Sequence, residues 1–171
     1  MTIHAEHPFR DPEPDPVRRL RGRLGGTVAL LTSGEGADRA GLTVTSLVVA
    51  AGDPSYALVL VDPDSDLADA VADTGKAVLQ LLSWGDRDLA EVFAGLAPAP
   101  GGAFRQAPFE VTEWGPRLTT ATTWAGLVLE GAREVGWSSE LMLRLARVEV
   151  GTDAEPLLHR RGRYRRATEL G

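Results

Sequence analysis

The sequence predicts an all-β protein that forms a closed or nearly closed antiparallel barrel, and three observations lead to this prediction. Short runs rich in Val, Leu and Thr are bounded by glycine, proline or acidic turns, as β-strands are. Only two short segments between them show helical spacing of apolar residues. A doubly wound α/β sheet needs a helix between most parallel strands, so these helices are too few for it. We therefore expect an antiparallel barrel of about six strands with short flanking helices.

The expected elements follow one another from residue 27 onward. Strands are predicted at residues 27–33, 42–50, 56–62, 76–83, 124–134 and 141–150. Helices are predicted at residues 64–75, where Gly75 is the stop signal, and at residues 86–96. The proline- and glycine-rich residues 97–109 are too long for a tight turn, so they are expected to form a surface excursion or a lid.

The chain divides into an N-terminal tail and one domain. Residues 1–18 are rich in proline and acid and hold few apolar side chains, which is typical of a flexible tail. Residues 19–168 are expected to form the domain, because a chain of 171 residues with 43% hydrophobic content can bury one well-packed core.

Composition excludes several classes of function. Basic residues are outnumbered 18 to 24 by acidic ones, which argues against a nucleic-acid partner. No cysteine is present, so the protein has no disulfide, thiolate nucleophile or cysteine-bound zinc, and any redox chemistry requires a bound cofactor. No apolar run approaches the roughly 20 residues of a membrane helix. We expect a cytoplasmic protein without a membrane partner.

Hydroxyl groups are concentrated in the predicted strand that contains "GLTVTSL", residues 41–47. Successive side chains of a strand alternate faces, so Thr43 and Thr45 are expected to share one face. That face either meets solvent or binds a ligand, and the sequence pattern alone leaves both interpretations open.

Three aspartates, Asp62, Asp64 and Asp66, follow the apolar strand at 56–62 at alternate positions. In a magnesium-dependent aspartyl phosphatase Asp62 would be the nucleophile, although such enzymes have α/β sheets. A second interpretation is that Asp64 or Ser65 caps the following helix. A phosphate could also bind at that helix N-terminus. We expect no metal site, because the calcium-loop pattern is incomplete and His159 is the only histidine outside the tail.

The order of several segments resembles the flavin reductase family. "GLTVTSL" is followed by "DPSYALVLVD", by "KAVLQLLS" with Gln80, by "LAEVFAGL" with Phe93, and finally by "PLLHRRGRYRR". No single segment is specific, but their order and spacing are similar to those of the family from Arg19 to Arg166.

This resemblance implies a homodimer of split barrels, each with FMN at its edge, although FAD or a deazaflavin in place of FMN stays open. It implies hydride transfer from NAD(P)H to the flavin and a monooxygenase as a possible partner. A non-catalytic flavin-binding module and, less in keeping with the strands, the phosphatase remain the alternatives.

The resemblance also implies the residues that bind the cofactor. Residues 43–47 would lie along the isoalloxazine ring and ribityl chain, and the helix start near Ser65, with Arg161, would hold the phosphate. Trp137 lies near the place of a histidine that many family members have, where this chain has Ser138 and Ser139. No catalytic residue is implied. The predicted cofactor-binding residues are Thr43, Val44, Thr45, Ser46, Leu47, Asp62, Ser65, Leu67, Gln80, Phe93, Trp137 and Arg161.

Overall fold

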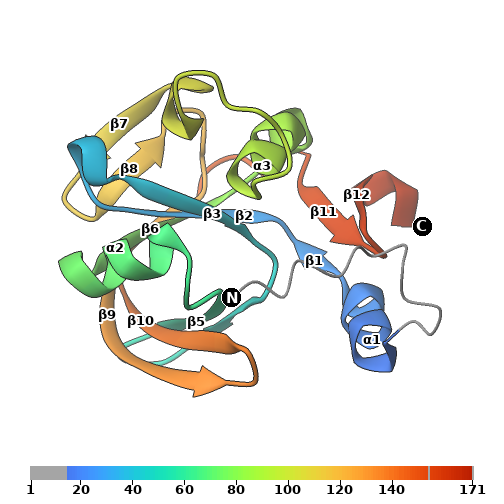
Figure 1. Ribbon diagram of the computed structural model, residues 1–171, viewed down its shortest axis with the longest axis horizontal. Helices are drawn as coiled ribbons and strands as arrows, with labels where there is room; N and C mark the ends of the chain where they lie inside the picture. The colour runs from blue at the N-terminus through green and yellow to red at the C-terminus, as the bar shows by residue number, and fades with distance from the viewer. Residues whose placement is uncertain (1–14, 154, 171) are drawn as a thin grey trace.

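A curled antiparallel sheet of seven strands forms the body of the molecule (Figure 1), and it confirms the predicted β-rich barrel. The computed structural model describes residues 15–153 and 155–170. The strand order is β3-β2-β6-β9-β10-β5-β4. These strands are β2 (Ala29–Ser33), β3 (Ala40–Val44), β4 (Leu47–Ala50), β5 (Tyr56–Val61), β6 (Lys76–Leu81), β9 (Trp124–Val135) and β10 (Ser138–Glu149).

The two edge strands of this sheet, β3 and β4, are separated in sequence by only Thr45 and Ser46. β3 pairs with β2 and β4 pairs with β5, so the sheet must curl until its opposite edges meet. This junction is called the seam below. The single strand predicted at residues 42–50 is therefore wrong, because the chain changes its pairing partner at Thr45 and Ser46.

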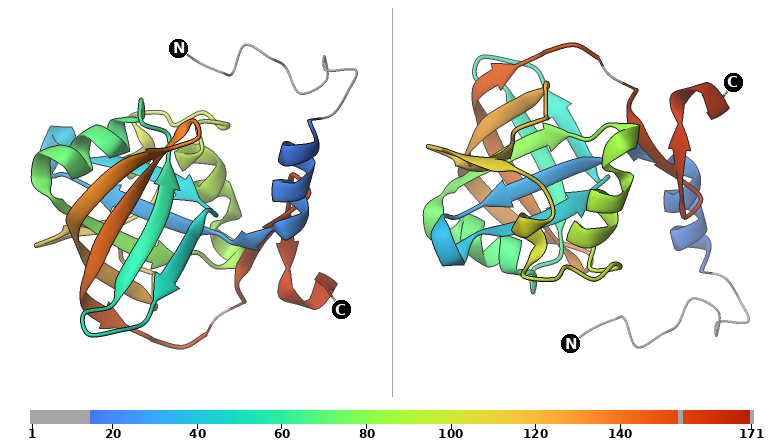
Figure 2. Two further views of the ribbon diagram at one scale, coloured as in Figure 1. Left: turned by 90° about the horizontal axis from the view of Figure 1, so that it is seen from below. Right: turned by 90° about the horizontal axis from the view of Figure 1, so that it is seen from above.

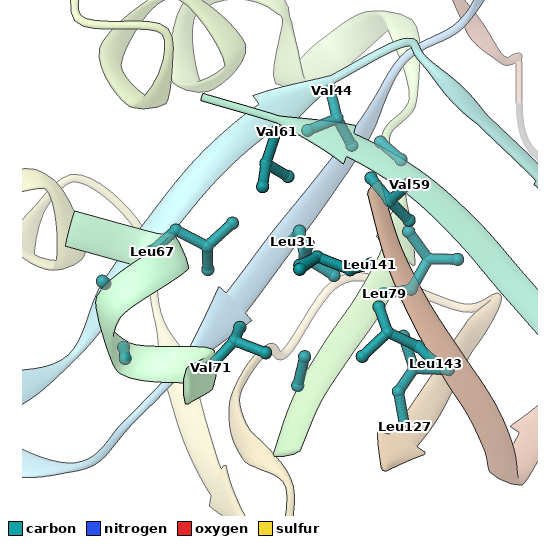
Figure 3. Close-up of a cluster of buried hydrophobic side chains, with 14 of the residues drawn as sticks. Leu31, Val44, Val59, Val61, Leu67, Val71, Leu79, Leu127, Leu141 and Leu143 are labelled. Carbon is teal, nitrogen blue, oxygen red and sulfur yellow. The ribbon is translucent and has the colours of Figure 1, made fainter. Parts of the chain in front are cut away.

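The interior of the barrel is filled by apolar side chains (Figure 3). Val59 and Val61 of β5 alternate inward, as a half-buried strand requires, and they meet Leu141 and Leu143 of β10. Helix α2 (Asp66–Thr74) directs Leu67 and Val71 into the same cluster. Ser65 caps this helix by accepting a hydrogen bond from the Ala68 N–H, which confirms the capping interpretation.

A second apolar cluster lies on the other side of the sheet. Helix α3 (Arg87–Phe93) brings Phe93 against Phe104 and Phe109, and the ring centroids of the first pair are 5.1 Å apart. Phe104 belongs to a short 3-10 helix (Ala103–Arg105) within the predicted excursion at 97–109, which is thus packed against the domain. The other short elements are two 3-10 helices (Gly36–Asp38 and Trp84–Asp86) and the hairpin of β7 (Phe109–Thr112) and β8 (Gly115–Leu118).

A small lobe stands beside the barrel in Figures 1 and 2. It contains α1 (Pro16–Leu24), β1 (Gly26–Thr27), β11 (Leu157–Arg160), β12 (Arg163–Arg166) and a last 3-10 helix (Ala167–Leu170), with β1, β11 and β12 in one sheet. Helix α1 is not predicted by the sequence analysis and begins inside the expected tail, of which residues 1–14 lie outside the described residues. It buries no residue, and its apolar side chains Val17, Leu20 and Leu24 are exposed.

None of the helices in the described residues is long and apolar enough to cross a membrane.

Candidate functional site

A groove of about 1220 Å³ runs along the seam between the barrel and the lobe. Its walls come from the end of β3, the start of β4, β5, helix α1 and the turn between β11 and β12. Seven of the twelve predicted binding residues line it, namely Thr43, Val44, Thr45, Ser46, Leu47, Asp62 and Arg161. The fold thus brings together segments that are more than a hundred residues apart in the sequence.

The hydroxyl groups of the seam have different partners. Thr43 Oγ1 donates to the carbonyl of Ala90 in α3 at 2.7 Å, and Ser46 Oγ donates to the carbonyl of Leu60 at 2.9 Å. Thr45 is exposed, and in the described part of the chain no protein group accepts a hydrogen bond from its hydroxyl. Two of the three hydroxyls are therefore paired, Thr43 with α3 and Ser46 with β5, and Thr45 is the one available to a ligand.

Backbone amides at the seam are also available. Neither Thr45 nor Ser46 donates its N–H to another group within the described residues, whereas the Ser46 carbonyl accepts from the Leu60 N–H at 2.9 Å. Unpaired donors at a strand junction are suited to the polar edge of a heteroaromatic ligand.

The aspartate segment after β5 is internally hydrogen-bonded. Asp62 Oδ1 accepts from the Asp64 N–H at 2.9 Å, and the Ser65 hydroxyl donates to the Asp62 carbonyl at 2.7 Å. Asp62 lines the groove and Ser65 does not. The aspartates serve as a turn and helix cap, and within the described residues no group of three potential ligands could hold a metal ion. The antiparallel barrel also overturns the phosphatase alternative, which requires an α/β sheet.

Three predicted binding residues lie away from the groove. Leu67 is 1% exposed and packs in the barrel interior, and Phe93 belongs to the aromatic cluster of the second core. Gln80 is completely buried: its Nε2 donates to Thr32 Oγ1 at 3.0 Å, and its Oε1 accepts from the Leu118 N–H at 2.7 Å. These side chains pack in the two cores and do not line the groove, so their role in binding stays a prediction.

Trp137 is 82% exposed in the turn between β9 and β10 and does not line the groove, so its role stays a prediction. Other residues of the same hairpin, Val135 and Glu140, do line it. Glu140 Oε1 accepts from Arg133 Nε at 2.8 Å.

Sequence reasoning missed the basic wall of the groove. Four arginines of α1, Arg18, Arg19, Arg21 and Arg23, line it together with the predicted Arg161. The available signal was the segment "DPVRRLRGRLG", in which an aspartate cap, a proline at the helix start and a terminal glycine mark a helix. Its high arginine content also made it differ from the acidic tail before it.

His159 is a further missed groove residue. It lies on β11, and its ring meets that of Tyr164 edge to face, with centroids 5.6 Å apart. Burial lowers the pKa of His159 below its usual 6.5, while the nearby Glu91 acts in the opposite direction. Burial, with Glu91, raises the pKa of Tyr164 to about 12. His159 therefore presents a neutral imidazole to the groove at pH 7.

The groove fits a flat heteroaromatic ligand that carries an anionic group. Thr45 and the two free amides supply polar contacts, while Leu47, Val48 and Leu58 supply apolar surface. Its volume exceeds the roughly 300–1000 Å³ of a typical small-molecule pocket, so there is room for a second ligand.

The chain is similar to known proteins over most of its length. Residues 21–168 match the family model described as flavin reductase like domain. The chain is 26% identical over 152 residues to FMN reductase (NADH) RutF of Methylorubrum extorquens, covering 86% of this chain and 72% of that protein. It is 24% identical to the 4-hydroxyphenylacetate 3-monooxygenase reductase component of Pseudomonas aeruginosa, covering 87% and 89%. Among solved structures, the NADH:FAD oxidoreductase SgcE6 of Streptomyces globisporus has a TM-score of 0.79 at 21% identity, covering 94% and 95%.

Proposed function

Because the chain belongs to the flavin reductase like domain family, we propose that it is an NADH-dependent flavin reductase that binds FMN in the groove at the seam. The observation that carries this proposal is the convergence of Thr45, the free amides of Thr45 and Ser46, and Arg161 on one groove. One relative is named FMN reductase (NADH), and this name supports the choice of FMN as the flavin and NADH as the electron donor. The cytoplasmic location stays a prediction from the sequence.

The protein's contribution to the reaction is positioning. A bound flavin would supply the hydride-accepting chemistry. The free amides of the seam would orient its polar edge, while Val48 and its cross-strand partner Leu58 would pack on an apolar face. The neutral imidazole of His159 adds a polar group to the groove without adding charge. The remaining volume would admit the nicotinamide of NADH beside the flavin.

We also infer that the protein is a homodimer. Helix α1 exposes the stripe of Val17, Leu20 and Leu24, which are 63% to 75% accessible, and edge strand β4 exposes Val48 and Val49. Unpaired edge strands and apolar stripes of this kind are normally covered in the native assembly. Sedimentation equilibrium is expected to give twice the chain mass of 18.2 kDa, and Leu20→Glu is expected to shift it toward the monomer.

A monooxygenase is the proposed acceptor of the reduced flavin. A relative is by name the reductase component of a monooxygenase, which supports this role. If a separate oxygenase consumes the product, reduced flavin must leave the protein, so FMN is expected to behave as an exchangeable substrate and to dissociate on gel filtration.

The first test is a titration of the purified protein with FMN, followed by NADH or NADPH without oxygen. Binding is expected to perturb the visible flavin spectrum, and NADH is expected to bleach it. Thr45→Trp should abolish binding by filling the groove, whereas the control Glu113→Trp, exposed in the β7–β8 turn, should bind FMN as the wild type does. Flavin that binds without bleaching would favour the non-catalytic module, and absence of flavin binding would overturn the proposal.

A further inference from the structure

We infer that His159 is a specificity-determining residue of the groove: its imidazole forms hydrogen bonds with an amide group of a bound ligand. This inference rests on the proposed function and adds to it a residue of the lobe. The shared chemistry is a carbonyl next to an N–H, which the pyrimidine part of the flavin and the carboxamide of the nicotinamide both carry.

His159 lies close to the seam in space, although it is far from Thr45 in the sequence. Strand β11 pairs with β1, so that His159 stands opposite Gly26. Gly26 in turn lies against the seam, because a Cβ added there would be 3.2 Å from the Thr45 carbonyl oxygen. Paired residues of neighbouring strands have Cα atoms about 4.5–5.5 Å apart. One short strand therefore separates His159 from Thr45, and both residues line the same groove.

Tyr164 holds the imidazole of His159 from one side. The two residues are paired on β11 and β12, so their side chains lie on the same face of the small sheet. The rings meet edge to face with centroids 5.6 Å apart, and Tyr164 packs in turn against the second apolar cluster. A side chain that is already packed loses less freedom when it binds a ligand, so this contact prepares His159 for binding.

The nitrogens of the imidazole are left without a protein partner. Among residues 15–153 and 155–170, no group forms a hydrogen bond with the half-buried side chain of His159. Burial lowers its pKa below 6.5 against the effect of Glu91, so at pH 7 the neutral ring has one nitrogen that donates and one that accepts. An amide group offers the complementary carbonyl acceptor and N–H donor.

Most other polar side chains of the groove cannot match an amide in this way. Arginine only donates, and an ionised carboxylate only accepts. The hydroxyls of Thr43 and Ser46 already donate to main-chain carbonyls. Within the described residues, Thr45 and His159 are the two groove side chains that are unpaired and can both donate and accept. They belong to the barrel wall and the lobe wall, so a ligand between them would be bound from both sides.

Packing on Tyr164 is the competing explanation of His159, and substitutions separate the two roles. Phenylalanine keeps an aromatic ring but has no nitrogen, whereas the amides of asparagine and glutamine keep a donor and an acceptor without the ring. Asparagine places its amide near the position of Nδ1, and glutamine near that of Nε2. A packing role predicts that His159→Phe is the mildest change, and a hydrogen-bonding role predicts that it is the most severe.

The test measures two dissociation constants in the full-length protein: that of FMN by quenching of flavin fluorescence, and that of NAD⁺ for the FMN-loaded protein by calorimetry. At least one constant is expected to rise about fivefold or more in His159→Phe, as the loss of one or two hydrogen bonds implies. His159→Asn or His159→Gln is expected to recover most of this loss. The control Arg163→Gln, at an exposed β12 position of the same lobe outside the groove, should change each constant by less than about twofold.

The two ligands distinguish the two sources of the amide group. A loss confined to NAD⁺ would assign His159 to the nicotinamide, and a loss of FMN affinity would assign it to the flavin; both support the inference. Unchanged constants in His159→Phe, or a loss that neither amide variant reduces, would overturn it while leaving the proposed function intact. If His159→Phe does not fold, the comparison of His159→Leu with His159→Gln takes its place. Failure of the wild type to bind FMN would overturn the proposed function itself.

Discussion

The hydroxyl of Thr43 donates to the carbonyl of Ala90 at 2.7 Å, which joins the end of β3 to helix α3 beside the groove. Two positions further along, the Thr45 hydroxyl shares the same groove but has no such partner among residues 15–153 and 155–170. Thr43→Val is therefore expected to lower the free energy of unfolding by about 1 kcal/mol, the usual net contribution of one hydrogen bond.

Thr45→Val is the matched substitution, with the same change of shape. It is expected to change the unfolding free energy by less than about 0.5 kcal/mol, because the residue is exposed. It is also expected to weaken FMN binding more than Thr43→Val does. Urea unfolding and FMN titration of both variants check this, and a reversed order in either measurement would contradict the assignment of the two hydroxyls.

Because Trp114 lies close to Gly126, replacing Gly126 of β9 by alanine is expected to cost much more stability than replacing Gly131 of the same strand. A Cβ at Gly126 would lie 2.3 Å from Cδ2 of Trp114, whose ring is tilted against that of Trp124, whereas at Gly131 the nearest atom would be the methyl of Met142 at 3.6 Å. Gly126→Ala is expected to destabilise the protein by about 1–3 kcal/mol, which corresponds to roughly 2–9 °C in Tm.

Gly131→Ala provides the control on the same strand. It should leave Tm unchanged or raise it slightly, because alanine in a strand loses less backbone entropy on folding than glycine does. Equal losses of Tm for both substitutions would show that Trp114 does not pack on Gly126 in solution.

Gln80 is expected to act on stability and not on flavin binding. Its replacement by leucine would leave the buried Leu118 N–H without an acceptor and Thr32 without its amide partner. An unsatisfied buried donor costs about 1–3 kcal/mol, so Gln80→Leu should reduce the free energy of unfolding by that amount. The FMN dissociation constant of the folded variant should match that of the wild type; a selective loss of FMN affinity would restore Gln80 to the binding site.

The strands of the barrel could be predicted because their evidence is local. The short apolar run from Tyr56 to Val61 predicts a strand, in whose geometry alternate side chains such as Val59 and Val61 point inward. Gly75 ends α2 in the left-handed conformation that glycine favours. The break at Thr45 and Ser46 could not be read in this way. The break arises because β3 pairs with β2 whereas β4 pairs with β5. These pairings depend on the curled sheet as a whole and not on the local sequence.

The site was predictable only in part, for a related reason. Residues 43–47, Asp62 and Arg161, which the family resemblance predicted as cofactor-binding, line one groove. The sequence and the resemblance could not show that the Thr43 hydroxyl meets a carbonyl 47 positions away, or that Gln80 is enclosed by Thr32 and Leu118. The arginines of α1 were missed because its first residues were assigned to the tail, although Val17, Leu20 and Leu24 recur at helical spacing.

His159 is expected to make the protein less stable below about pH 6.5. Burial lowers its pKa in the folded state, so between that value and the unfolded value near 6.5 the unfolded chain binds more protons. The contribution of His159 to stability therefore rises with pH through this window and is constant above it.

The free energy of unfolding, measured in urea, should fall from pH 7.5 to pH 5.5 by less in His159→Phe than in the wild type. Tyr164→Phe removes a neighbouring group whose pKa, about 12, lies far above this range, so it should keep the wild-type difference. If His159→Phe also keeps that difference, the imidazole is not buried against Tyr164 as described.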